Sequence, residues 1–200
     1  MSGHRRSIST FTLFAAFAIL SSPFTCTAQL AERPTQSQAR TANPDSKEVN
    51  DLLNRAKTHA LQLKTDAIEM KAFTHQNLGW ESHGDKINAI KQDVDSLCQT
   101  AAKLNSVKSD ASPWQKAAIA RISPLLKELA DNTTSVINHL NKEQGRFLYS
   151  PEHKNLLEAN ADLSSDLSAV VSNYVDYGKT RSKFFELRQK LELSEGRSQM

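Results

Sequence analysis

Most of the glycines and prolines after residue 43 lie between four long segments that share a helical pattern. The separating residues are Pro44, Gly79, Gly84, Pro113, Gly145 and Pro151. Between them, apolar side chains recur at spacings of three and four, which keeps them on one face of an α-helix. No segment alternates apolar and polar residues over the length of a strand. The pattern therefore predicts an all-α protein.

The first two predicted helices have regular apolar stripes of the kind found in coiled coils. We expect the first over residues 46–76, with Asp45 and Glu48 as its capping pair, and the second over residues 85–108. The predicted core positions are Val49, Leu53, Ala56, Ala60, Leu63, Ala67 and Met70 in the first helix, and Ile87, Ile90, Val94, Leu97, Ala101 and Leu104 in the second.

The third and fourth predicted helices each begin at a Ser-Pro pair, Ser112-Pro113 and Ser150-Pro151. Serine caps a helix, proline fits the first helical position, and Gln115 completes a capping box with Ser112. Pro124, almost opposite the third stripe, predicts a kink with its ring toward water. The predicted core positions are Ile119, Ile122, Leu126, Leu129, Thr133, Val136, Leu140 and Phe147, followed by Leu156, Leu163, Leu167, Val170, Tyr174, Tyr177, Phe184 and Leu191 in the fourth helix.

Four amphipathic helices with short connections predict an antiparallel up-down-up-down four-helix bundle over residues 45–193, with a long C-terminal helix and a flexible tail over 194–200. At ~1.5 Å per residue, the fourth helix is far longer than the second. We expect residues 183–193 to project, to fold back at Gly178, or to pack on something else. This segment is either a solvated end or a contact surface for a partner or a second copy, through Phe184, Phe185, Leu187 and Leu191.

Residues 1–28 have the order of features that is typical of a secretory signal peptide. Arg5 and Arg6 precede an apolar run over residues 11–20, and Cys26-Thr27-Ala28 offers small residues for cleavage after Ala28. The run is too short for a permanent anchor, so we expect no transmembrane segment in the mature chain. The pattern predicts a periplasmic or secreted protein, exported by the general or the twin-arginine route. Residues 29–44 are expected to form a disordered spacer.

The charge balance and the cysteine count of the chain after Ala28 limit the partners and cross-links that we expect. Removing Arg5 and Arg6 leaves 23 basic against 22 acidic side chains, and this balance argues against a nucleic-acid partner. One cysteine, Cys98, remains, so a disulfide framework is excluded. We expect Cys98 to be a small buried residue, with an intermolecular bridge or a reactive thiol as the alternatives.

The sequence contains no recognisable catalytic or cofactor motif. A Cys-x-x-Cys-His haem site, a Glu-x-x-His di-iron pair, a glycine-rich phosphate loop, a Gly-x-Ser-x-Gly elbow and a zinc-protease helix are all missing. We therefore expect a non-enzymatic protein without a resident cofactor.

The predicted helix order brings several histidines together at one end of the bundle. In the predicted bundle, the first and third turns lie at the same end, which gathers most of the histidines there. Imidazoles and carboxylates are ligands for zinc, copper or nickel, so this pole is a candidate site for a transition metal or a small ligand. The alternative is a polar cap whose Trp80 and Tyr149 cover the core. The candidate ligands are His75, His83, His139 and His153, with Glu81 and Glu143 beside them.

Polar residues also interrupt the predicted core. Thr133 lies on the third stripe, and Asn160 and Arg181 lie near the fourth. Such interruptions usually set the register of helix pairing. We expect Arg181 at the edge of the bundle, with its stem packed and its guanidinium in water.

Three blocks, residues 80–83, 112–126 and 137–141, resemble a family of exported all-helical bacterial proteins to which no activity is assigned. The resemblance covers most of residues 46–193 and implies a bacterial envelope or secreted setting. It transfers no catalytic residue. We therefore expect an exported, non-enzymatic bundle that acts as an interaction or structural module, with metal or small-ligand binding at the histidine pole as the alternative.

Overall fold

The computed structural model describes residues 44–76, 78–143 and 148–197. These residues form four long helices, α1 (Lys47–Ala72), α2 (Trp80–Ser106), α3 (Pro113–Glu143) and α4 (Pro151–Arg197), with two short turns, η1 (Phe73–His75) and η2 (Lys108–Asp110). No strand occurs within these ranges, which confirms the all-α prediction. The predicted signal peptide, nearly all of the predicted spacer, Gly145 and Phe147 lie outside the described residues.

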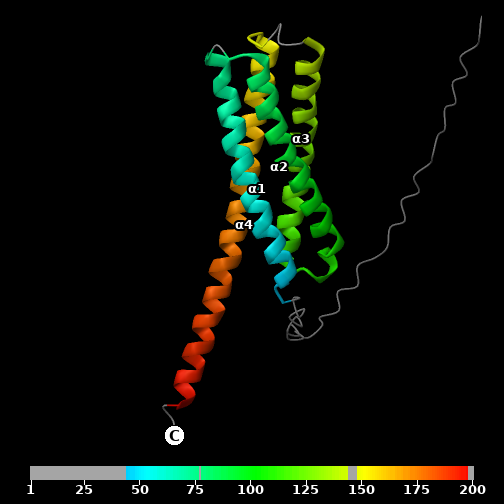
Figure 1. Ribbon diagram of the computed structural model, residues 1–200. Coiled ribbons are helices and arrows are strands. Elements are labelled where there is room, and N and C mark those ends of the chain that lie inside the picture. Colours follow the sequence, from blue (N-terminus) through cyan, green and yellow to red (C-terminus); the bar gives the residue numbers. More distant parts are fainter. Residues whose placement is uncertain (1–43, 77, 144–147, 198–200) are drawn as a thin grey trace, which may run out of the picture. The chain divides into compact units, whose positions relative to one another are not determined.

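Successive helices run in opposite directions, as predicted for an up-down-up-down bundle (Figure 1). Two ion pairs define the direction of α4 against α1. Lys57 Nζ lies 2.8 Å from Asp176 Oδ1, and Lys71 Nζ lies 2.8 Å from Glu158 Oε1. Later positions in α1 therefore meet earlier positions in α4, which is the antiparallel arrangement.

The predicted stripes of α1, α2 and α3 form the core. Every predicted position of α1 is buried, and so are those of α2 except Ala101, which is partly buried. In α3 the predicted positions are buried as far as Val136, and Leu140 is partly buried. Pro124 lies within α3 and is exposed, so its ring points toward solvent as expected.

The predicted core stripe of α4 was only partly right: Leu167 is fully buried, but the fully packed face lies to one side of the predicted stripe. Leu156, Leu163, Val170 and Tyr174 are only partly buried, and Tyr177 is exposed. The fully packed face is rich in small and polar residues, which a search for apolar spacing passes over. The Ser164 hydroxyl, for example, donates to the carbonyl oxygen of Asn160 at 2.6 Å within the helix. The buried positions are His153, Leu157, Asn160, Ala161, Ser164, Leu167, Ser168, Val171 and Val175.

The first turns of α1 and α3 are joined by one buried side chain. Gln115 Oε1 accepts from the backbone N–H of Ser112 at 2.9 Å, which is the Gln115 half of the predicted capping box, and also from that of Ser46 at 3.0 Å. The Ser112 hydroxyl, predicted to complete the box, is buried without a hydrogen-bond partner among the described residues. The predicted Asp45–Glu48 cap was wrong. Ser46 caps α1 instead, and Asp45 Oδ1 accepts from Trp114 Nε1 at 2.7 Å.

A second buried polar contact links α3 to α4 in mid-bundle. The Thr133 hydroxyl donates to Asn160 Oδ1 at 3.0 Å, and Asn132 Nδ2 donates to the same oxygen at 3.2 Å. Two of the three polar residues predicted to interrupt the core, Thr133 and Asn160, therefore pair with each other across the helix interface. That this contact sets the register of α4 stays a prediction.

Candidate functional site

Three of the predicted histidines meet at the end of the bundle where α1 and α3 finish. His83 of α2 and His153 of α4 are fully buried, and His153 Nε2 lies 3.4 Å from His83 Nδ1. The ring of His139 of α3 stacks on that of His153, with 5.3 Å between centroids. Phe73 packs its ring edge-on against His83 at 5.4 Å. We call His83, His139 and His153 the histidine cluster.

Burial favours the neutral forms of His83 and His153. Burial, together with smaller contributions from the neighbouring His83 and His139, lowers the pKa of His153 to about 4. Burial also lowers the pKa of His83. A carboxylate oxygen of Glu152 lies 3.9 Å from His139 Nδ1, at the exposed rim of the cluster. Because these two buried rings have little solvent to stabilise charge, His83 and His153 take up a proton only at a cost in folding free energy.

The other members of the predicted metal set are placed differently. His75 is exposed in η1 and takes no part in the ring contacts of the cluster, and Glu81 is exposed in the first turn of α2. The side chain of Glu143 lies outside the described residues. Within residues 44–76, 78–143 and 148–197, no group of three or more His, Cys, Asp or Glu side chains is placed to hold one metal ion. A metal site at this pole stays a prediction.

The two aromatic residues expected to cover the core lie at its rim. Trp80 is 56% exposed and Tyr149 is 45% exposed. The Tyr149 hydroxyl lies 3.2 Å from the carbonyl oxygen of Gln76 and 3.0 Å from that of Leu78, so it ties the turn before α4 to the turn before α2. Trp80 borders a hollow of about 650 Å³ whose walls include Ile87 and Leu140.

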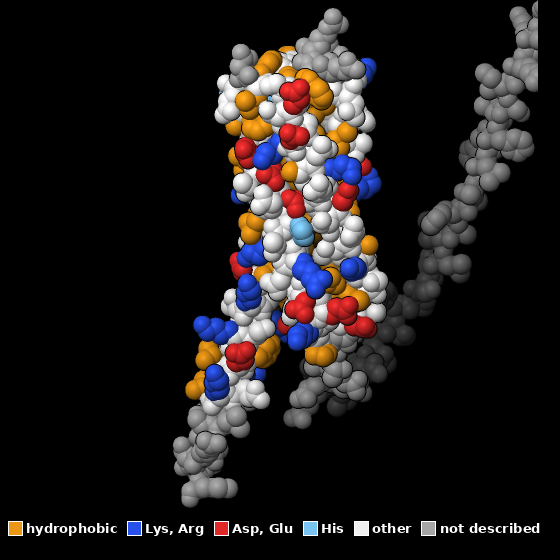
Figure 2. All heavy atoms as spheres, viewed as in Figure 1, with side chains coloured by type: hydrophobic (Ala, Val, Ile, Leu, Met, Phe, Trp, Pro, Cys, Tyr) orange, Lys and Arg blue, Asp and Glu red, His pale blue; other side chains and the backbone are white. Residues whose placement is uncertain are grey.

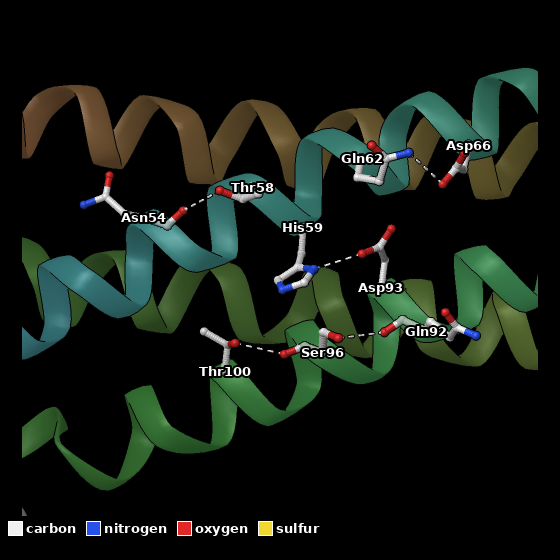
Figure 3. Close-up of polar contacts among 9 residues, drawn as sticks. All are labelled: Asn54, Thr58, His59, Gln62, Asp66, Gln92, Asp93, Ser96 and Thr100. Atoms are coloured by element: carbon white, nitrogen blue, oxygen red, sulfur yellow. Dashed lines mark hydrogen bonds and ion pairs between the residues drawn. The ribbon is translucent and has the colours of Figure 1, made fainter.

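The fifth mature histidine makes a contact that the sequence analysis missed. His59 of α1 points toward Asp93 of α2, with 2.9 Å between Nδ1 and Oδ1 (Figure 3). Each of them precedes a predicted core position, Ala60 or Val94, and that placement could have indicated a pair along the seam between the two helices. A second α2 residue, Lys86, bridges to Asp66 and Glu69 of α1. These contacts link α1 to α2.

Beyond Gly178, α4 leaves the bundle and continues as a helix to Arg197 (Figure 1). Residues 182–191 are all exposed. We call residues 182–197 the α4 extension. Of the three expected outcomes, projection is the one observed. The helix does not fold back at Gly178, and it runs past the predicted end at residue 193 into the predicted tail. The exposed apolar side chains of the extension are Phe184, Phe185, Leu187 and Leu191.

The base of the extension is held by contacts to α3 and to the residues before α1. Gly178 is buried against the indole of Trp114, and the Tyr177 ring packs edge-on against the same indole at 5.4 Å. Arg181 Nε lies 3.3 Å from Asp45 Oδ2, and its guanidinium carbon lies 5.0 Å from the centre of the Phe185 ring. Arg181 is at the edge of the bundle as expected, but its guanidinium pairs with a carboxylate.

Cys98 is exposed, contrary to the expected buried thiol. It follows Leu97 of the core stripe and therefore points away from the core face. Partial desolvation and the charge of Asp95 raise the pKa of the thiol, which reduces the thiolate fraction at neutral pH.

No known family model, curated protein or solved structure matches this chain. The resemblance to exported all-helical bacterial proteins therefore stays a prediction. Among the helices of the described ranges, none combines the length and the apolar character needed to cross a membrane.

Proposed function

We propose that this chain is an exported, non-enzymatic helical bundle of the bacterial envelope that acts as an interaction module. The α4 extension is its contact surface. The features before Ala28 support export, and the lack of a recognisable catalytic motif in the sequence supports a binding role.

One observation carries the proposal. The bundle accommodates only the first part of α4, yet the helix continues and presents large apolar side chains to solvent. Phe184 is 61% exposed and Leu191 is 65% exposed. Clustered exposed apolar side chains on a soluble protein typically mark a surface that binds something, because water exposure of such groups is unfavourable.

Site-specific photo-cross-linking in intact producing cells tests the proposal. A benzophenone amino acid at Leu187 is expected to form a discrete adduct with a protein or with lipid. The matched control is the same amino acid at Leu61 of α1, which is 47% exposed and lies on the bundle. Adducts from position 187 but not from position 61 support the proposal. Equal yields at both positions, or none at position 187, overturn it.

A second candidate function, capture of a transition metal or a small ligand, rests on the histidine cluster. The specific observation in its favour is that His83 Nε2, His139 Nε2 and His153 Nδ1 are buried without a hydrogen-bond partner among the described residues. Zinc, copper and nickel should then each be tested for a shift of the unfolding temperature. A shift that His153→Gln removes supports this function, and no shift with any of the three metals rejects metal capture.

A further inference from the structure

The α4 extension has an apolar stripe with basic borders. At 100° per residue, Tyr177, Phe184, Leu187 and Leu191 fall on one side of the helix. All four are exposed, from 49% for Tyr177 to 65% for Leu191. Lys179, Lys183 and Lys190 follow one border of this stripe, and Arg181 and Arg188 follow the other. The face is that of a basic amphipathic helix.

Basic charge is concentrated on residues 177–191, around the start of the α4 extension, whereas residues 182–197 as a whole carry a net charge of +1 because Glu192 and Glu195 follow. Residues 177–191 contain five basic side chains and a single acidic one, Glu186, a net charge of +4, whereas the whole chain carries 25 basic and 22 acidic side chains. The remaining residues are therefore slightly acidic in balance. Blue and orange side chains lie together on the part of α4 that leaves the bundle (Figure 2).

The apolar stripe lies opposite the packed face of α4, although Tyr177 at its base contacts Trp114 of α3. Leu167, Val171, Val175 and Gly178, which pack into the bundle, lie on the far side of the helix from the stripe. A broad surface can therefore approach Phe184, Leu187 and Leu191, which lie beyond the contact of Tyr177 with Trp114. The contacts of Gly178 with Trp114 and of Arg181 with Asp45 hold the base of the helix in that orientation.

We propose that the occupant of this face is an anionic lipid bilayer surface. This inference rests on the proposed function and names the partner. Phe184, Leu187 and Leu191 would enter the boundary between headgroups and acyl chains, while the lysines reach the phosphates along the border. A second copy is the less favourable occupant, because pairing through the apolar stripes would bring the basic borders of two copies together, and residues 177–191 carry a net charge of +4 in each copy.

Vesicle co-sedimentation tests the inference. The protein used is the chain from Gln29 onward, which contains every described residue and lacks the apolar run at 11–20 that would itself enter a bilayer. We expect binding to vesicles of phosphatidylglycerol and phosphatidylcholine in equal parts, and far weaker binding to pure phosphatidylcholine. A basic side chain near an anionic surface strengthens binding about fivefold, so Lys183→Gln/Lys190→Gln should weaken it about 30-fold.

Two matched controls separate this surface from general charge and general apolar exposure. Lys103→Gln/Lys154→Gln makes the same change in net charge at exposed positions on the bundle and should bind like the unmodified chain. Phe184→Gln/Leu187→Gln should lose binding about tenfold or more, whereas the control Leu61→Gln/Ile68→Gln, at two positions that are each 47% exposed on α1, should not.

The results of these experiments can reject lipid binding without rejecting the proposed interaction module. Absence of binding to phosphatidylglycerol vesicles overturns the inference, and so does equal weakening by the two lysine pairs. If cross-linking at Leu187 then yields a protein adduct, the interaction module stands and its partner is a protein. If light scattering shows a dimer that dissociates when the chain is ended after Arg181, the occupant is a second copy and the lipid inference fails.

Discussion

Gly178 of α4 leaves the space that the indole of Trp114 occupies: a Cβ atom built on Gly178 would lie 2.6 Å from Trp114 Cη2. The indole cannot move aside easily, because its Nε1–H donates to Asp45 Oδ1 at 2.7 Å. This contact sets how closely α4 approaches α3 at the point where α4 leaves the bundle.

We therefore expect Gly178→Ala to destabilise the protein. Overpacking costs about 1–3 kcal/mol, and the better helix propensity of alanine offsets up to about 1 kcal/mol of it. Urea unfolding followed by circular dichroism measures the change. Gly84→Ala in α2 is the matched control, because nothing lies within 4 Å of its added Cβ, and it should stabilise by up to about 1 kcal/mol. Equal effects at the two glycines would contradict the close packing at Gly178.

Acid should weaken the bundle through the histidine cluster. The pKa of His153 is about 4 in the folded protein and ordinarily 6.5, so the unfolded chain binds more protons between these values. Stability is then fully present above pH 6.5 and falls as the pH drops toward 4, by about 2 kcal/mol between pH 7.5 and pH 4.5. The groups facing His153 are His83 of α2, His139 of α3 and, through His139, Glu152.

Substitution isolates this contribution from the carboxylates that also titrate in acid. Unfolding free energies at the two pH values should differ by about 2 kcal/mol less in His153→Gln than in the unmodified chain. His75→Gln, at an exposed position, should leave the pH dependence unchanged. A His153→Gln protein with the full acid sensitivity would show that the cluster is not its source.

Gln115 is expected to be among the most sensitive positions in the chain. It is fully buried, its Oε1 accepts from the backbone N–H groups of Ser46 and Ser112, and its Nε2 donates to the Ser46 carbonyl and to Asn50 Oδ1. Gln115→Ala leaves buried donors without partners and should cost about 3 kcal/mol. Gln92→Ala, at an exposed position of α2, should change stability by less than about 0.5 kcal/mol. A loss below about 1 kcal/mol at Gln115 would argue against its linking role.

Export can be tested at the protein level. N-terminal sequencing of the protein from producing bacterial cells should start at Gln29, with the product outside the cytoplasm. Arg5→Lys/Arg6→Lys separates the two routes: continued export indicates the general route, and retention of the precursor indicates the twin-arginine route. An unprocessed chain in the cytoplasm would contradict the localisation that the proposed function assumes.

The sequence predicted the helices and three of the four core stripes well, because apolar spacing is a local signal. It was only partly right on α4, where Ser164 and Ser168 are buried although their side chains are polar. The Ser164 hydroxyl is satisfied by the carbonyl oxygen of Asn160, a contact that apolar spacing does not reveal. The core face of such a helix is decided by its partners rather than by its own apolar residues.

The placement of the histidines at one pole was also predicted only in part. Topology brought His83, His139 and His153 together as predicted, since each lies within about two turns of a helix end at the same pole. It could not place His75, because the direction of a side chain in η1 depends on the path of the turn. In the same way, Asp45 had the local pattern of a cap but is engaged by Trp114 and Arg181, which are distant in sequence.

The continuity of α4 through Gly178 also changes the cost of ordering the extension. A free peptide of that length must nucleate its first helical turn, and short helices are marginal in water for that reason. Here residues 151–178 are already helical in the packed bundle and serve as the nucleus, so residues 182–197 only need to propagate the helix. We expect amide hydrogen exchange in α4 to accelerate progressively toward Arg197, because the helix frays with distance from the packed bundle. When the extension is bound, exchange along it should slow, because binding holds those residues in the helix.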